Sequence, residues 1–231
     1  MKNENFQRSL FETVTIPDSR MQATEFCEKL AKFDEFGTKT VVEQKNIGNV
    51  FLSVYRNEFW TAKQRQSESI HEISYRACFK AQLPRFFIES LTHKNDFVYD
   101  PFAGRGTTII EAALLGRQVV ANDVNPLSKI LCKPRLNVPG LNDIWNRLNE
   151  IPIEQGAKSE LDLSMFFHPE TEAEIVSLKN YLQVKSFQGT ADYIDDWIRM
   201  VATNRLTGHS SGFFSVYTLP PNQAVKPERQ K

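Results

Sequence analysis

Residues 96–131 constrain the fold more than any other part of the chain. They read DFVYD, P, FAGRGTT, IIEAALLG, RQVVAND and VNPLSKIL in direct succession. Short apolar runs, a glycine loop and two helix-like stretches in this order predict strand, loop, helix, strand, loop and helix. Gly116 stands where the first helix should end, and Pro126 stands where the second should begin. The sequence therefore predicts an α/β fold.

The loop from Asp100 to Thr108 has the composition of a ligand-binding turn. Gly104 and Gly106 have no Cβ, so the backbone can turn tightly there and approach a ligand closely. The N-terminus of the following helix offers free N–H groups to a carboxylate or a phosphate. Neither common nucleotide-phosphate motif fits, because Ile109 replaces the third glycine of a dinucleotide fingerprint and no lysine follows Gly106.

The second predicted strand ends at Asp123. An acid at this position, beside a glycine loop, can accept hydrogen bonds from both hydroxyls of a ribose. A nucleoside with an amino-acid tail would match these parts, with its charged end at the glycine loop and Asp100 and its purine over Val124 and Asn125. S-adenosylmethionine has this construction and no pyrophosphate, so it is the predicted cofactor.

The same residues resemble a known family. DPFAGRGTT is similar to the DPF(A/M)GSGTT cofactor motif of DNA methyltransferases that modify exocyclic amino groups, at adenine N6 or cytosine N4, and VVANDVNPLS is similar to the segment that follows it. Residues 59–91 resemble the motif that precedes the cofactor loop, although its Lys-Pro pair is Lys80-Ala81 here, with proline only at Pro84. The resemblance covers about residues 55–132 and implies double-stranded DNA as partner, with the target base flipped. The predicted cofactor-binding residues are Tyr75, Lys80, Asp100, Phe102, Ala103, Gly104, Gly106, Thr107, Thr108, Asp123, Val124 and Asn125.

The catalytic motif of that family, (D/N/S)PP(Y/F/W), has no match in the chain. The one Pro-Pro pair, Pro220-Pro221, lies between Leu219, which has no hydrogen-bond acceptor, and Asn222, which has no aromatic face. We interpret this segment as a loop and predict no catalytic residue. The chain alone is expected to be inactive, as the cofactor half of a truncated or split methyltransferase whose catalytic half lies downstream or on a second polypeptide.

Three regions follow from these patterns. Residues 1–54 form a lead with a small helix and one or two strands, residues 55–134 form the S-adenosylmethionine-binding part, and residues 135–231 form a helical insertion or target-recognition-like segment. The predicted fold class is α/β, a partial Rossmann-like class I methyltransferase sheet with a mainly helical C-terminal segment. Residues 211–219, SGFFSVYTL, look extended.

Composition narrows the function classes. Lys+Arg and Asp+Glu both number 28, so no overall charge indicates a polyanionic partner, but residues 56–94 have a net charge of +3 and are where we would first seek a phosphate backbone. Arg105 is expected to point to solvent or to a DNA phosphate. The three cysteines are far apart and lack a CxxC pair, which argues against disulfides and zinc, and the four histidines are expected at the surface or at helix ends. The N-terminus has no apolar signal region, so a cytoplasmic protein is predicted.

Some alternatives remain open. Trp60 and Tyr75 could close over the cofactor, stack on a base, or simply pack in the core. RNA methyltransferases that act on guanosine N2 have a closely similar glycine loop, and a non-catalytic subunit or remnant could bind S-adenosylmethionine without transferring its methyl group. The sequence does not choose between adenine N6 and cytosine N4.

Overall fold

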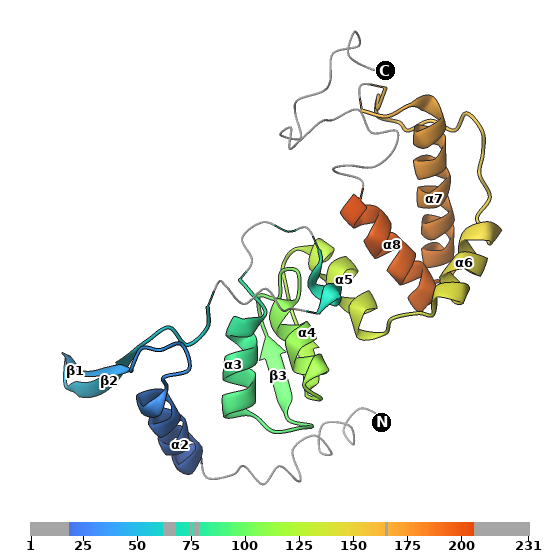
Figure 1. Ribbon diagram of the computed structural model, residues 1–231. Helices are drawn as coiled ribbons and strands as arrows, with labels where there is room; N and C mark the ends of the chain where they lie inside the picture. The colour runs from blue at the N-terminus through green and yellow to red at the C-terminus, as the bar shows by residue number, and fades with distance from the viewer. Residues whose placement is uncertain (1–18, 62–67, 74, 76–78, 165, 206–231) are drawn as a thin grey trace.

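A computed structural model describes residues 19–61, 68–73, 75, 79–164 and 166–205 of the chain (Figure 1). Predictions for Cys78, for residues 211–219 and for the Pro220-Pro221 loop lie outside the described residues. In chain order, the elements are α2 (Ser19–Lys32), β1 (Val41–Ile47), β2 (Val50–Arg56), the 3-10 turn η1 (Ser69–His71), α3 (Gln82–Leu91), β3 (Phe97–Asp100), α4 (Thr107–Leu114), β4 (Gln118–Ala121), α5 (Pro126–Cys132), the 3-10 turn η2 (Lys133–Leu136), α6 (Leu141–Glu150), α7 (Pro169–Phe187) and α8 (Tyr193–Arg205).

The central unit is the predicted strand-helix-strand arrangement. β3 and β4 pair in parallel, with Phe97 opposite Gln118 and Asp100 opposite Ala121, and α4 connects them. Gly116, with a φ of +75°, follows the end of α4 and allows the chain to turn back into β4. The carboxyl ends of both strands therefore lie at one edge, where the glycine loop and the residues after β4 meet.

The described strands confirm only part of the predicted sheet. The described strands form two separate two-stranded sheets, β1-β2 and β3-β4, so the structure confirms a mixed α/β fold without a Rossmann-like sheet among these residues. Val119 packs on one side against Ile109 of α4. On the other side, the side chains of Phe97 and Tyr99 are 60% and 59% exposed. Parallel sheets normally bury both faces, whereas this strand pair leaves one apolar face exposed.

An aromatic cluster joins the N-terminal elements to the central unit. The ring of Phe86 in α3 lies 5.8 Å from that of Phe33, 5.6 Å from that of Phe59 and 6.4 Å from that of Trp60, measured between centroids. Trp60 therefore packs among aromatic side chains, which is one of the three roles that the sequence left open. From this cluster the antiparallel hairpin β1-β2 extends away from the rest of the molecule (Figure 1).

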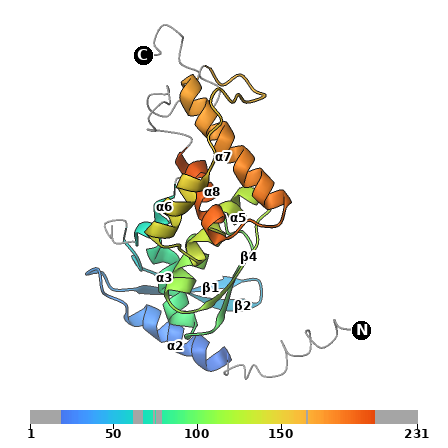
Figure 2. The same cartoon turned by 90° about the vertical axis from the view of Figure 1, so that its right-hand side faces the viewer.

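The described part of the C-terminal segment is mainly helical, as predicted. Helices α6, α7 and α8 gather at one end of the molecule, and α2 with the hairpin lies at the other (Figure 2). Arg147 of α6 donates hydrogen bonds to Asp192 at 2.8 Å and to the fully buried Asp195 at 2.5 Å. Met200 of α8 packs against Leu131 of α5, which joins this helical part to the central unit. Among the described residues, no helix is long and apolar enough to cross a membrane.

Candidate functional site

The glycine loop is held against the end of β4 by backbone hydrogen bonds. The Asn122 N–H donates to the Asp100 carbonyl at 2.9 Å, and the Ala103 N–H donates to the Asn122 carbonyl at 3.0 Å. These bonds continue the parallel pairing beyond the last strand residues. The loop after β3 and the loop after β4 are consequently adjacent.

Asp123 joins these two loops through its side chain. Its Oδ2 accepts a hydrogen bond from the Gly104 N–H at 2.7 Å, and its Oδ1 accepts one from the Asn125 N–H at 2.8 Å. These two hydrogen bonds, the one from Asn125 first, lower the pKa of the Asp123 carboxyl below its usual value. A half-buried, ionised carboxylate therefore stands at the tip of β4.

The two glycines of the loop meet different requirements. Gly104 has a φ of +53°, and a Cβ at this position would lie 3.6 Å from Cε1 of Tyr75, an ordinary contact distance. Gly106 has a φ of +82°, and a Cβ there would lie 2.4 Å from the Sγ of Cys132. Backbone conformation favours glycine at both positions, and close packing excludes any side chain at Gly106.

The remaining loop residues divide into packed and accessible groups. Ala103 and Thr107 are buried, and Thr108 is half-buried at the start of α4. In contrast, the side chains of Phe102 and Val124 are 85% and 97% exposed.

Two predicted site residues at the edge of the site accept backbone hydrogen bonds with their side chains. Asp100, half-buried, uses its Oδ1 to accept a hydrogen bond from the Phe102 N–H at 3.0 Å. Asn125 caps α5 by accepting a hydrogen bond from the Leu127 N–H at 3.0 Å. The edge therefore presents carboxylates with apolar surface beside them.

The two predicted site residues that precede the loop in sequence differ in position. Tyr75 is half-buried beside Gly104 and packs against the cluster of Ile73, Leu131 and Met200. Lys80 is exposed just before α3, and within the described part of the chain its side chain has no hydrogen bond to the glycine loop. The structure thus brings Tyr75 to the loop, whereas the role of Lys80 stays a prediction.

The side chain of Arg105 does not point where the sequence predicts. Its guanidinium donates to the carbonyls of His71 at 3.3 Å and Ile73 at 3.0 Å, and to Thr107 Oγ1 at 3.1 Å. The side chain therefore turns inward to the protein backbone, away from solvent and from any DNA phosphate. The reason is that three acceptors, two carbonyls and one hydroxyl, lie within its reach once residues 71–73 pack on the loop.

Arg135 is a functional candidate that sequence reasoning missed. It is only 4% exposed and donates to the carbonyls of Leu131 at 2.8 Å and Ile70 at 3.1 Å, and also to that of Arg105. Burial lowers the pKa of its guanidinium. Together with Arg105, it fixes residues 70–73 against the glycine loop. No local motif marks this residue, because its partners are backbone carbonyls distant in sequence.

His71 departs from the expected surface histidine. It is buried, and its Nε2 lies 2.6 Å from Oε1 of Glu111, which also accepts a hydrogen bond from Arg85 Nε at 2.7 Å. Burial alone would raise the pKa of Glu111, but the hydrogen bond with His71 and the charge of Arg85 together lower it. This polar cluster lies between η1, α3 and α4 and holds the segment before Tyr75 in place.

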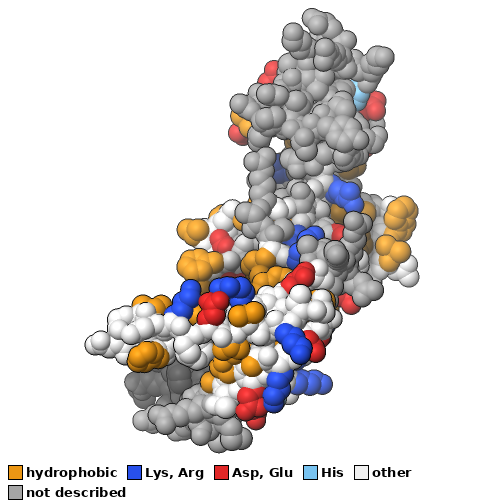
Figure 3. Space-filling view, turned by 60° about the vertical axis from the view of Figure 1, so that its left-hand side comes forward, with side chains coloured by type: hydrophobic (Ala, Val, Ile, Leu, Met, Phe, Trp, Pro, Cys, Tyr) orange, Lys and Arg blue, Asp and Glu red, His pale blue; other side chains and the backbone are white. Residues whose placement is uncertain are grey.

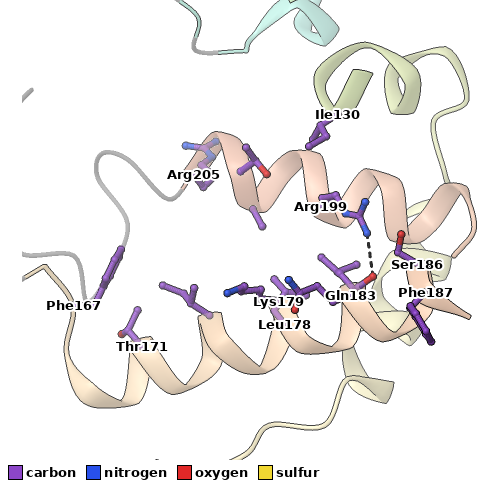
Figure 4. A pocket seen from close by; sticks show the side chains of 14 residues that line it. Ile130, Phe167, Thr171, Leu178, Lys179, Gln183, Ser186, Phe187, Arg199 and Arg205 are labelled. Atoms are coloured by element: carbon purple, nitrogen blue, oxygen red, sulfur yellow. Dashed lines mark hydrogen bonds between the residues drawn. The ribbon is translucent and has the colours of Figure 1, made fainter. Parts of the chain in front are cut away.

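Two cavities lie near these elements. One of about 460 Å³ lies between β4 and α5, and its lining includes Asp123 and Asn125. Another, of about 730 Å³, lies between α7 and α8, where Arg199 donates to the Leu182 carbonyl at 3.1 Å (Figure 4). The second cavity has a mainly apolar lining without a carboxylate, so it offers no acceptor pair for ribose hydroxyls. Among the described residues, no group of three or more potential metal ligands is present.

Comparison with known proteins gives a family match that includes this site. Residues 12–129, which hold β3, the glycine loop, β4 and most of α5, match the family described as DNA methylase, of the N6/N4 type. A match to DNA methylases does not favour the RNA alternative. No solved structure matches the chain.

Two relatives are similar over part of their length. The Type II methyltransferase M.BsoBI of Geobacillus stearothermophilus is 30% identical over 125 residues, which cover 45% of this chain and 25% of that protein. The Type II methyltransferase M.MjaII of Methanocaldococcus jannaschii is 25% identical over 76 residues, which cover 32% of this chain and 14% of that protein. The chain thus spans a quarter or less of the length of these relatives.

Proposed function

This chain belongs to the DNA methylase family of the N6/N4 type, and from that premise we propose that it binds S-adenosylmethionine for site-specific methylation of double-stranded DNA. The acceptor is an exocyclic amino group, cytosine N4 or adenine N6, on a base flipped out of the duplex. Methyltransferases of this family generally use S-adenosylmethionine, and the question for this chain is which of its residues would hold it.

The lone pairs of Asp123 carry the proposal. An ionised carboxylate offers about four acceptor positions on its two oxygens. The backbone N–H groups of Gly104 and Asn125 occupy one position on each oxygen. One position on each oxygen is left, which matches the two adjacent hydroxyls of a ribose. The two free acceptor positions therefore fit the sugar of the cofactor.

The surfaces beside Asp123 fit the two ends of the same molecule. The exposed Val124 side chain offers an apolar surface for the purine ring. On the other side, Asp100 and the start of α4 offer a carboxylate and a helix N-terminus, which suit the ammonium and carboxylate of an amino-acid end. Tyr75, beside Gly104, would border that end.

The chemistry itself comes largely from the cofactor. S-adenosylmethionine supplies a methyl group already activated by its sulfonium. The residues described above would bind the nucleoside, fix its orientation and limit the access of water. We assign no catalytic residue within the described part of the chain.

Calorimetric titration with S-adenosylmethionine tests this assignment. Asp123→Ala should reduce cofactor affinity by roughly 100-fold or more, because both ribose hydroxyls lose their acceptor and Gly104 loses its tether. Asp162→Ala is the matched control, since the Oδ1 of Asp162 also accepts a backbone N–H, from Ser164 at 3.0 Å, and its pKa is also lowered. It should leave the affinity unchanged. Wild-type affinity in Asp123→Ala, with unchanged circular dichroism, would reject the assignment.

A further inference from the structure

The hairpin β1-β2 is exposed on both of its faces. Of the residues in these two strands, only Glu43, Val54 and Tyr55 are half-buried, and none is buried. At its outer end, Phe51 is 76% exposed and Ile47 is 64% exposed. A two-stranded hairpin is marginal in water without a surface to pack on. Figure 3 turns this side of the molecule forward and shows apolar and basic side chains together on its surface.

The strand register sorts the side chains of the hairpin into two faces. Gln44 lies opposite Ser53, and Asn46 lies opposite Phe51, so these four residues share one face. The face contains amides, a hydroxyl and an aromatic ring, and no charged side chain. Near the base of the hairpin, Tyr55 on the same face is half-buried. The accessible part of this face is therefore its outer half.

The charged side chains of the hairpin lie on its opposite face and at its base, and together they are net positive. Residues 39–56 contain Lys39, Lys45 and Arg56 against a single acid, Glu43. Glu43 is paired with Arg56, whose guanidinium lies 3.0 Å from the carboxylate. Both lysines are exposed. A net positive hairpin with an uncharged amide face is complementary to a duplex groove, where bases lie between two rows of phosphates.

We propose that the β1-β2 hairpin enters a groove of duplex DNA and contacts base edges through its outer uncharged face. This inference rests on the proposed function, because family membership is what makes DNA the expected partner. Asn46 and Gln44 can each form paired hydrogen bonds with adenine, and Phe51 can contact a thymine methyl. Lys45 lies opposite Leu52 on the other face of the hairpin, and its long side chain would reach the phosphates that border the groove.

The dimensions of the hairpin are compatible with this placement. Each strand has seven residues and, at about 3.4 Å per residue, extends about 24 Å. Two strands about 4.8 Å apart fit a major groove about 12 Å wide.

Fluorescence anisotropy with the full chain and 30-base-pair duplexes of random sequence tests the proposal. Phe51→Ala should weaken duplex binding roughly fivefold to tenfold. Lys45→Gln should weaken it and lower the slope of log affinity against log salt by about 1. The matched control is Phe187→Ala, which removes a side chain 95% exposed at the end of α7 and should have no effect.

The outcomes separate this proposal from the proposed function. Hairpin variants that weaken DNA binding and retain wild-type affinity for S-adenosylmethionine support both. Loss of DNA binding in Phe51→Ala by a chain that binds no S-adenosylmethionine supports the hairpin and rejects the cofactor site. Unchanged DNA binding in both hairpin variants overturns the inference. No duplex binding by the wild-type chain, or a change only in its oligomeric state, also overturns it.

Discussion

A single methyl group at position 106 should disturb the glycine loop severely. In Gly106→Ala, the new Cβ would lie 2.4 Å from Cys132 Sγ and 3.3 Å from Cys132 Cβ. Carbon and sulfur atoms do not approach this closely, so the loop or α5 has to move. Movement is resisted, because Cys132 and Arg135 are each only 4% exposed and Arg135 is bonded to three backbone carbonyls.

The expected loss of stability has two parts. Gly106 has a φ of +82°, and holding alanine in this left-handed region costs about 1–2 kcal/mol. Inserting a carbon atom into a filled core costs about 1–3 kcal/mol more. Together these give about 2–5 kcal/mol, a large share of the roughly 5–15 kcal/mol that stabilises a typical domain.

Urea unfolding followed by circular dichroism measures this loss, and two variants separate its parts. Gly189→Ala has a similar φ of +68° with no atom within 4 Å of the new Cβ, so it should lose only about 1–2 kcal/mol. The double variant Gly106→Ala/Cys132→Ala removes the clashing sulfur. It should be about 1–3 kcal/mol more stable than the sum of the two single effects.

Equal losses in Gly106→Ala and Gly189→Ala would refute the packing argument, because they would leave backbone conformation as the sole cause. Additive effects in the double variant would refute it independently.

Two further predictions concern the charged groups. Glu111→Gln should destabilise the chain by about 2–4 kcal/mol, because it leaves His71 and Arg85 without their buried anion. Glu89→Gln, at the exposed partner of Arg85, should change stability by less than about 0.5 kcal/mol. Urea unfolding at pH 7 distinguishes the two variants. The hydrogen bonds from Arg147 lower the pKa of Asp192 to about 2, so its stabilising contribution is present above the unfolded value near ~3.9 and is lost as the pH falls toward 2. Unfolding midpoints at pH 5, 4 and 3 should therefore fall less steeply in Asp192→Asn than in the wild type.

The parts of the fold set by local pattern were predictable from the sequence. The helices and strands of the central unit follow from short-range apolar periodicity, and Gly116 and Pro126 mark helix ends through their own backbone preferences. The position of Asp123 beside Gly104 followed from the rule that parallel strands end at one edge. Its ribose-binding role remains a prediction.

The parts set by distant contacts were not predictable. Arg105 was expected to reach outward because no sequence signal indicates that the carbonyls of His71 and Ile73 pack beside it. His71 was expected at the surface, and its burial depends on Glu111, 40 residues away. The Rossmann-like character of the sheet depends on strand pairing outside any local pattern, and it stays a prediction that the family resemblance implies.

The tethers from Arg105 and Arg135 have a consequence for ligand binding. They hold the glycine loop to residues 70–73, and Asp123 holds it to the end of β4, before any ligand arrives. A preorganised loop loses little conformational entropy on binding, so less of the interaction energy is consumed in ordering it. Amide hydrogen exchange in this loop should then be slow already in the free protein and change little when the cofactor binds.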